Sequence, residues 1–224
     1  MRFELYVLTD PALTRDRPLL PIVAAALAAG ATAVQLRDKS ASPRDLLPLG
    51  AEMRRMAHRH QAAFLVNDRV DLALVLEADG VHVGPEDLPP LEARRLLPRP
   101  RLLGVSARTP QAALSAERAG ADYLGAGPVF PTSTKPDAGP ALGLEGLSAI
   151  VKAVSIPVVG IGGIHAANAA SVIEAGAAGI AVISAVMAAE DPEKAVRDLL
   201  ASIGAPLRRR RTEEEREETG RARE

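Results

Sequence analysis

The stretch AGATAVQL, residues 29–36, ends an Ala-rich helical pattern, turns at a glycine and begins an apolar strand. The same unit recurs as AGADYLGA at residues 119–126 and as AGAAGIAV at residues 175–182. Glycine commonly closes a helix because it adopts the left-handed backbone conformation without strain. The recurrence indicates a chain of repeating β–α units, each seen where a helix turns into the next strand.

Eight short apolar runs have the character of strands, and helical patterns separate them. The runs cover residues 5–10, 33–38, 63–68, 80–84, 102–107, 122–129, 157–163 and 179–186. Ser42, Thr109 and Asp191 each precede a proline, as is typical of the first turn of a helix. Strands that alternate with helices predict a parallel sheet, and continuously apolar strands suit a sheet covered on both faces.

These patterns predict an α/β fold, with residues 1–204 forming a single (β/α)8 TIM barrel that carries the catalytic site. A doubly wound open sheet is the alternative, and it is disfavoured because no G-x-G-x-x-G motif follows the first strand. The last residues, RRRRTEEEREETGRARE at 208–224, contain 7 Arg and 6 Glu and too little apolar surface to form a core. We therefore expect residues 205–224 to be a charged tail, disordered or helical.

The composition restricts the partners. Of the 224 residues only 2% are aromatic and the net charge is −1, which argues against a nucleic-acid ligand. The sequence has no cysteine, which excludes disulfides and thiolate metal sites and fits a cytoplasmic location. The apolar segment 19–34 is shorter than a membrane span and contains Pro21 and Gly30, so we expect no membrane segment. The oligomeric state stays open, with a homo-oligomer as one option.

The second strand carries polar side chains at its end, where the chemistry of this fold is located. Side chains alternate along a strand, so Gln35, Arg37 and Lys39 should point one way. Leu36 and Asp38 should point the other way. If Leu36 packs against the helices, the first set lies in the barrel mouth, where two cations and an amide suit a polyphosphate.

Asp68 and Asp87 follow the third and fourth strands, which are neighbours in a barrel. They could share a cation, and carboxylates with few other protein ligands suit Mg²⁺, which keeps waters and binds substrate phosphates. His82, inside the fourth strand, is expected to be a packed, hydrogen-bonded residue. Ser106 ends the fifth strand without a His–Asp partnership nearby in the sequence, so we expect it to donate to phosphate and not to act as a nucleophile.

The longest irregular stretch follows the sixth strand and contains Thr132, Thr134 and Lys135. A long loop in a compact domain is usually a lid or a binding loop, and these groups suit an anionic substrate. Loops after the seventh and eighth strands commonly bind phosphate in this fold. Gly163 and the pair Ile183–Ser184 occupy those positions and would supply backbone and hydroxyl donors.

Six motifs, taken in order, resemble the thiamine phosphate synthase (thiamine-phosphate pyrophosphorylase) family. They are VQLRDK, VNDRVDLAL with ADGVHVGPEDLP, GVSA, GADYLGAGPVFPTSTK, IPVVGIGGI and AVISAV, within residues 5–200. The resemblance implies a (β/α)8 barrel enzyme that joins 4-amino-5-hydroxymethyl-2-methylpyrimidine diphosphate to a thiazole phosphate and releases pyrophosphate. Pro85 departs from the family, which often has Gln there.

The resemblance also assigns roles. Residues expected to bind the pyrimidine diphosphate are Gln35, Arg37, Lys39, Asn67, Ser106 and Lys135, of which Arg37, Ser106 and Lys135 are expected to be catalytic. Residues expected to bind the thiazole phosphate are Thr132, Thr134, Gly163, Ile183 and Ser184. Asp68 and Asp87 would hold the Mg²⁺ cofactor.

Two other functions remain as alternatives. A thiazole tautomerase on the same barrel needs neither diphosphate nor metal, and relatives of that type tend to lose the Asn67–Asp68 pair and to carry His near position 128, which is Pro here. A non-catalytic sensor of a phosphorylated ligand needs one pocket and no metal beside a leaving group. Two phosphate sites in one barrel favour the synthase.

Overall fold

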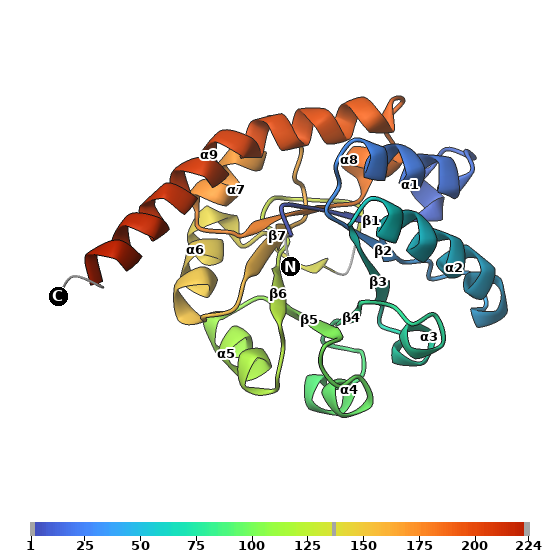
Figure 1. The fold of residues 1–224 in the computed structure, drawn as a ribbon, viewed down its shortest axis with the longest axis horizontal. Coiled ribbons are helices and arrows are strands. Elements are labelled where there is room, and N and C mark those ends of the chain that lie inside the picture. The colour runs from blue at the N-terminus through green and yellow to red at the C-terminus, as the bar shows by residue number, and fades with distance from the viewer. Residues whose placement is uncertain (1–2, 136–137, 222–224) are drawn as a thin grey trace.

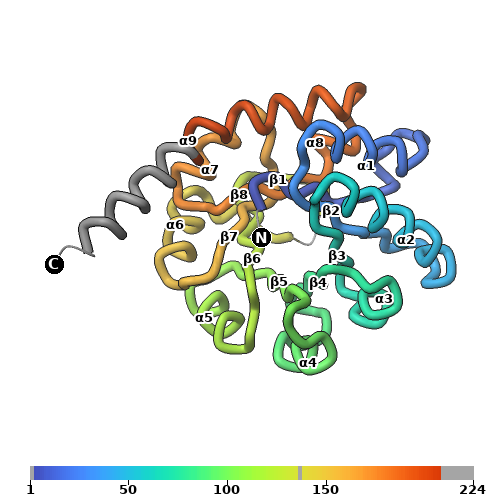
Figure 2. The backbone as a smooth tube through the Cα atoms, viewed as in Figure 1, coloured from blue at the N-terminus to red at the C-terminus, as the bar shows by residue number. Residues whose placement is uncertain are grey.

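The chain folds into a closed barrel of parallel strands surrounded by helices (Figures 1 and 2). The computed structural model describes residues 3–135 and 138–221, with side chains up to residue 207. Within this part of the chain, eight strands pair in chain order, and β8 closes the barrel against β1. The prediction of an α/β (β/α)8 barrel is confirmed.

The strands are β1 (Leu5–Leu8), β2 (Ala33–Leu36), β3 (Ala63–Asn67), β4 (Gly80–Val83), β5 (Leu102–Ala107), β6 (Tyr123–Ala126), β7 (Val158–Ile161) and β8 (Gly179–Val182). The helices are α1 (Leu19–Ala28), α2 (Pro43–Arg59), α3 (Val70–Val75), α4 (Pro90–Leu96), α5 (Pro110–Arg118), α6 (Gly143–Ala153), α7 (Ala169–Glu174), α8 (Ser184–Met187) and α9 (Pro192–Arg221), with a 3-10 turn, η1, at Pro11–Leu13.

Alternation along each strand divides the core into two layers. Leu5 and Val7 pack between sheet and helices, whereas Tyr6 and Leu8 pack inside the barrel. Leu36 joins the outer layer as expected, which turns its neighbours in β2 inward. Among the described residues, the outer layer buries the ring of Phe64, and the inner layer buries those of Phe3, Tyr6 and Tyr123. Ala, Val, Leu and Ile provide most of the remaining buried apolar surface.

The repeated glycine unit works in the same way at each occurrence. Gly30, Gly120 and Gly176 follow helices with φ of 106°, 95° and 101°. After Gly30, the N–H of Ala31 bonds back to Ala26 in the helix, and the N–H of Thr32 bonds to Leu5 of the preceding strand. The turn therefore ends the helix and sets the next strand beside the last one.

Every predicted strand except the fifth is shorter than its apolar run, and the difference is largest at the sixth and eighth strands. The sixth was expected to reach residue 129 but ends at Ala126, because Pro128 lacks the N–H that a central strand requires. The eighth was expected to reach residue 186 but ends at Val182, and α8 begins at Ser184. Val186 and Met187 are buried in that helix, and a short apolar run does not distinguish a strand from a buried helix.

Helix α9 lies across α1, α7 and α8 on the outside of the barrel (Figure 1). It passes residue 204 without interruption, and Leu207 is buried in the outer core layer, so packing continues beyond the expected boundary. The side chains of the charged segment 208–224 lie outside the described part of the structure. No described helix combines the length and the apolar character needed to cross a bilayer.

Candidate active site

A cavity of about 860 Å³ opens at the carboxyl ends of the strands. Its lining includes every site residue expected from the sequence except Asp68. Those residues are Gln35, Arg37, Lys39, Asn67, Asp87, Ser106, Thr132, Thr134, Lys135, Gly163, Ile183 and Ser184. They come from seven different strand ends, and the barrel brings them to one pocket.

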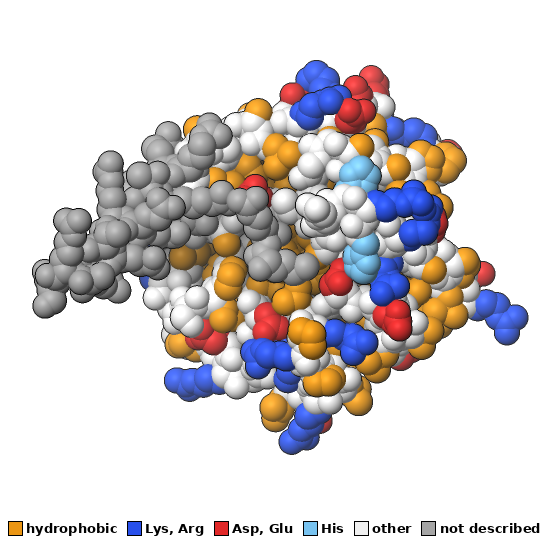
Figure 3. Space-filling view, viewed as in Figure 1, with side chains coloured by type: hydrophobic (Ala, Val, Ile, Leu, Met, Phe, Trp, Pro, Cys, Tyr) orange, Lys and Arg blue, Asp and Glu red, His pale blue; other side chains and the backbone are white. Residues whose placement is uncertain are grey.

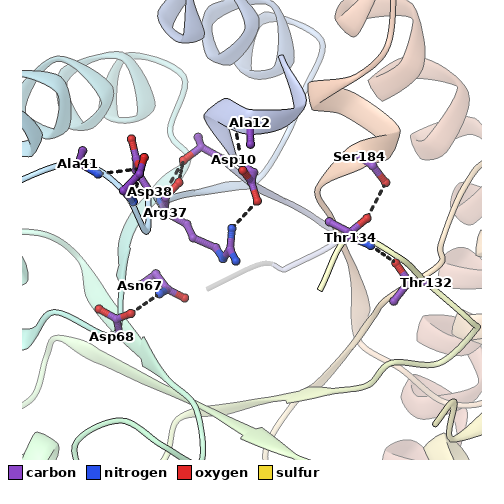
Figure 4. Close-up of polar contacts among 12 residues, drawn as sticks. Asp10, Ala12, Arg37, Asp38, Ala41, Asn67, Asp68, Thr132, Thr134 and Ser184 are labelled. Carbon is purple, nitrogen blue, oxygen red and sulfur yellow. Dashed lines mark hydrogen bonds and ion pairs between the residues drawn. The ribbon is translucent and has the colours of Figure 1, made fainter. Parts of the chain in front are cut away.

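Arg37, just beyond β2, is held from two sides. Its Nη1 donates to Asp10 Oδ2 at 2.6 Å, and both side chains are largely buried. Its backbone is fixed by Thr9, whose Oγ1 accepts from the Arg37 N–H at 2.8 Å and donates to the Arg37 carbonyl at 2.9 Å. Figure 4 shows the guanidinium reaching from β2 toward the centre of the pocket. Asp10 was not predicted from the sequence, although it also follows a strand.

Asn67 and Asp68 form one unit at the end of β3. Asn67 Nδ2 donates to Asp68 Oδ2 at 2.7 Å, and Asp68 has a positive φ of 54° (Figure 4). Its backbone N–H bonds to the carbonyl of His82 in β4 at 2.8 Å. This bond fixes the Asp68 backbone beside β4, the strand that precedes the loop with Asp87.

The two aspartates interact electrostatically. Burial raises the pKa of the Asp68 carboxyl, and the nearby charge of Asp87 raises it further, while Lys39 opposes both effects. Asp87 is fixed by the Gly84 N–H, which donates to its Oδ2 at 2.7 Å. Two carboxylates that repel one another at the edge of a cavity lined by basic side chains are a donor set that fits Mg²⁺. Among the described residues, no three acidic or histidine side chains gather as a denser metal site.

Ser106 has a histidine partner that was not predicted from the sequence. His82 Nε2 lies 3.0 Å from Ser106 Oγ, and His82 Nδ1 lies 3.0 Å from the Tyr123 hydroxyl. The expectation that His82 is packed and hydrogen-bonded is confirmed, and Ser106 has a histidine neighbour but, as expected, no His–Asp partnership. The other ring nitrogen meets a phenol in place of a carboxylate, so the trio is not a Ser–His–Asp triad.

The opposite rim is built from the loop after β6 and the ends of β7 and β8. Thr134 Oγ1 donates to Ser184 Oγ at 3.2 Å, and the Thr134 N–H donates to Thr132 Oγ1 at 3.2 Å (Figure 4). Asn168 Nδ2 donates to the Gly163 carbonyl at 2.9 Å. The rim thus holds hydroxyls and exposed backbone close together, on the side of the pocket away from Arg37.

Gly163 is required by a close approach. Its φ is 66°, and a Cβ there would lie 2.6 Å from the Pro131 carbonyl oxygen and 2.8 Å from Phe130 Cβ. The loop after β6 therefore rests directly on the β7 end. A side chain at this position would displace the loop that carries Thr132 and Thr134.

Basic groups dominate the pocket lining. Among the described residues, the lining carries the cations Arg37, Lys39, Arg108 and Lys135 and one carboxylate, that of Asp87. Arg108 was also missed from the sequence; its Nη2 donates to the Pro140 carbonyl at 2.7 Å. It lies two residues after Ser106, so strand alternation alone indicates its direction. On the face drawn in Figure 3, by contrast, basic and acidic side chains are interspersed around the rim.

A closed (β/α)8 barrel with a basic pocket at its carboxyl-terminal face is the arrangement of an enzyme that binds phosphorylated small molecules. The family model described as thiamine monophosphate synthase matches residues 5–186. The chain belongs to this family. The similarity extends well beyond the site residues, to most of the length of known members.

Two curated relatives are named thiamine-phosphate synthase. The one from Chloroflexus aurantiacus is 53% identical over 201 residues, which cover 90% of this chain and 93% of the relative. The one from Moorella thermoacetica is 53% identical over 198 residues, covering 88% and 94%. A solved structure titled thiamine phosphate pyrophosphorylase from Pyrococcus furiosus superposes with a TM-score of 0.85 at 47% identity, covering 92% of this chain and 97% of that one.

Proposed function

We propose that the protein condenses 4-amino-5-hydroxymethyl-2-methylpyrimidine diphosphate with a thiazole phosphate to give thiamine phosphate and pyrophosphate. The observation that carries this proposal is the presence of two different polar regions in one cavity. One has the cations Arg37 and Lys39 near two aspartates, and the other has the hydroxyls and backbone around Gly163. A transferase that joins two phosphorylated molecules needs both.

The first region suits the diphosphate. Arg37 and Lys39 extend from β2, Lys135 reaches in from the loop after β6, and all three line the cavity. Arg37 offers a planar fork of donors, whereas the lysines offer mobile point charges. Together they would neutralise charge that grows on the leaving pyrophosphate, with Asn67 available to bind the pyrimidine.

Asp68 and Asp87 would hold the magnesium ion. Both carboxylates already have one donor within the protein, from Asn67 and Gly84, which leaves further lone pairs for a cation. A bound Mg²⁺ would add positive charge at the diphosphate and relieve the repulsion between the two acids. The raised pKa of Asp68 means that protonation competes with the metal more strongly than at an ordinary aspartate.

The second region suits the thiazole phosphate. Thr132, Thr134 and Ser184 would donate hydroxyls, and Gly163 and Ile183 would donate backbone N–H groups. The hydrogen bond from Thr134 to Ser184 shows that the loop after β6 already lies against the end of β8. The acceptor can therefore be held in the same cavity as the diphosphate, which makes the second step effectively intramolecular.

In the reaction, the C–O bond between the pyrimidinylmethyl carbon and the diphosphate breaks, and the electron pair leaves with pyrophosphate. The carbon becomes a cation that the amino group of the pyrimidine stabilises. The lone pair of the thiazole nitrogen then forms the new C–N bond. The chain performs no covalent step; it binds both substrates, excludes water and stabilises the departing charge through Arg37, Lys39 and Lys135.

A coupled assay tests the proposal. Both substrates with Mg²⁺ should give pyrophosphate and thiamine phosphate in equal amounts, and omitting the thiazole phosphate should abolish thiamine phosphate. If thiazole isomerises and pyrophosphate never forms, the protein is a tautomerase. If both substrates bind and neither changes, it is a sensor.

The absence of cysteine from the sequence fits an enzyme that works in the reducing cytoplasm.

A further inference from the structure

Five polar side chains from five strands form a continuous hydrogen-bonded chain across the barrel interior. Gln35 Nε2 donates to the Tyr6 hydroxyl at 2.5 Å, and the Tyr6 hydroxyl lies 3.3 Å from that of Tyr123. The Tyr123 hydroxyl lies 3.0 Å from His82 Nδ1, and His82 Nε2 lies 3.0 Å from Ser106 Oγ. The two ends, Gln35 and Ser106, are expected substrate-binding residues.

Glycines on the adjacent strands provide the space for this chain. Gly104 of β5 pairs with His82 on one side and with Tyr123 on the other. A Cβ at Gly104 would lie 2.3 Å from the Tyr123 hydroxyl and 2.5 Å from His82 Nδ1. A Cβ at Gly125 would lie 2.9 Å from His82 Cε1. The backbone thus has no side chain where the histidine and the tyrosine meet.

Counting protons gives the chain a direction. Tyr6 accepts from Gln35, so its own single proton must go to Tyr123, because any other arrangement leaves a buried hydroxyl proton without an acceptor. Tyr123 then donates to His82 Nδ1. A neutral imidazole that accepts at Nδ1 carries its proton on Nε2 and donates it to Ser106 Oγ. The Ser106 proton is then left for the cavity.

The other end of this hydrogen-bond chain, at Gln35, offers an acceptor where the Ser106 end offers a donor. Gln35 is fully buried, and its Oε1 has no hydrogen-bond partner among the described residues. A buried amide oxygen without a partner is costly unless a ligand completes it. Gln35 and Ser106 both line the cavity, and the part of its wall that they form is called the floor below. The floor offers a ligand one acceptor, Gln35 Oε1, and one donor, the Ser106 hydroxyl.

We propose that His82, Tyr123 and Tyr6 are positioning residues, which act as a one-way hydrogen-bond chain that makes Ser106 a donor and the Gln35 carbonyl an acceptor toward the ligand. The hydrogen bonds to Tyr123 and Ser106 keep the imidazole of His82 neutral, with its proton on Nε2. Burial supports the neutral form by lowering the pKa of His82 to about 4. Burial likewise raises the pKa of both tyrosines, so their protons stay in place. Neither tyrosine needs to touch the substrate.

The ligand that fits this floor is a flat heterocycle with an amino group and an unprotonated acceptor atom on its edge. An exocyclic amino group would donate to Gln35 Oε1, and a lone pair of the same molecule would accept from Ser106. This assignment rests on the function proposed above, where the aminopyrimidine is such a ligand. The direction of the chain can be measured whether or not that function is correct.

The first experiment is a double-mutant cycle between Tyr123→Phe and Ser106→Ala. Tyr123→Phe removes the donor to His82 and keeps the ring, so kcat/KM for the pyrimidine diphosphate should fall by about 5- to 30-fold, as for one or two lost buried hydrogen bonds. In the Ser106→Ala background the same change should cost less than about 3-fold, because Tyr123 acts through Ser106. If the two losses multiply, Tyr123 acts by packing and the proposal is wrong.

Phe3→Leu is the matched control for packing. The Phe3 ring lies 4.2 Å, centroid to centroid, from that of Tyr123 in the same interior cluster, yet it has no polar atom. It should lower Tm at least as much as Tyr123→Phe and change kcat/KM by less than about 2-fold. An equal loss of activity in Phe3→Leu would show that the cluster matters only as packing.

The second experiment measures the His82 tautomer by ¹⁵N NMR in the free wild-type protein. The proposed direction of the hydrogen-bond chain requires a neutral His82 ring at pH 7 with its proton on Nε2. A proton on Nδ1 would reverse every hydrogen bond and overturn the assignment of Ser106 as a donor. If the wild type forms no pyrophosphate, the proposed function fails, while the NMR result still decides the direction of the chain.

Discussion

Arg37 and Asp10 form a largely buried ion pair at the edge of the cavity, with Arg37 Nη1 2.6 Å from Asp10 Oδ2. Asp10 caps the 3-10 turn η1, where its side chain also accepts from the Ala12 N–H. A rigid turn after β1 thus aims a cation that leaves β2. The pairing holds one side of the guanidinium and leaves the other donors for an anion.

Asp10→Ala should therefore reduce activity through Arg37. We expect kcat/KM for the pyrimidine diphosphate to fall about 10-fold, against roughly 10²- to 10³-fold for Arg37→Ala, because the charge remains but its direction is lost. The double variant should be no worse than Arg37→Ala alone. Steady-state kinetics on the three variants decides this, and multiplicative losses would show that Asp10 acts independently.

Glycine 163 allows a clean comparison with Gly143. The two have φ of 66° and 67°, but a Cβ at Gly143 meets nothing within 4 Å. Gly143→Ala should cost about 1–2 kcal/mol of unfolding free energy from backbone strain alone. Gly163→Ala should cost more and should raise KM for the thiazole phosphate, since it pushes on Pro131 and Phe130. If urea unfolding and KM show the same effects for Gly163→Ala as for Gly143→Ala, the close contact of Gly163 with Pro131 and Phe130 is contradicted.

The depressed pKa of His82 predicts how stability changes with pH. Between about pH 6.5 and pH 4 the unfolded chain takes up a proton on this histidine that the folded chain refuses, so stability falls as pH falls through this window. The full effect is roughly 3 kcal/mol. Chemical unfolding at pH 7 and pH 5 should show a smaller difference in His82→Gln than in the wild type. The raised pKa of Asp68 works in the opposite sense, and it is common to both proteins.

Magnesium should stabilise the fold through Asp68 and Asp87. A ligand that binds only the folded state raises Tm with its concentration, so Mg²⁺ with pyrophosphate should raise Tm in the wild type and much less in Asp87→Asn. Asp71→Asn is the control, because Asp71 is an exposed acid on α3 that pairs with Arg69. Its response should equal that of the wild type. A full response in Asp87→Asn would remove Asp87 from the metal site.

Much of this architecture was predictable because it depends on short-range patterns. The glycine units and the apolar runs determine the order of strands and helices, and the alternation around Leu36 determines which side chains enter the barrel. Strand ends were less predictable. The eighth apolar run continues into α8 at Ser184, and nothing in its composition separates the two.

The contacts within the site depended on register, which a single sequence does not contain. His82 meets Ser106 because β4 and β5 pair with His82 opposite Gly104, which places Ser106 two residues further along β5. Asp10 meets Arg37 because β1 and β2 end at the same level. Both pairs join residues more than twenty positions apart, so spacing along the chain gave no signal for either.

We expect Asp68, Asp87 and the basic side of the pocket to act together on a breaking C–O bond. The most direct measurement is the rate of pyrophosphate release as a function of Mg²⁺ concentration, in the wild type and in Asp68→Ala side by side. We expect a rate about 10²- to 10³-fold lower in the variant at low Mg²⁺. Undiminished release by Asp68→Ala at the same low Mg²⁺ would contradict it.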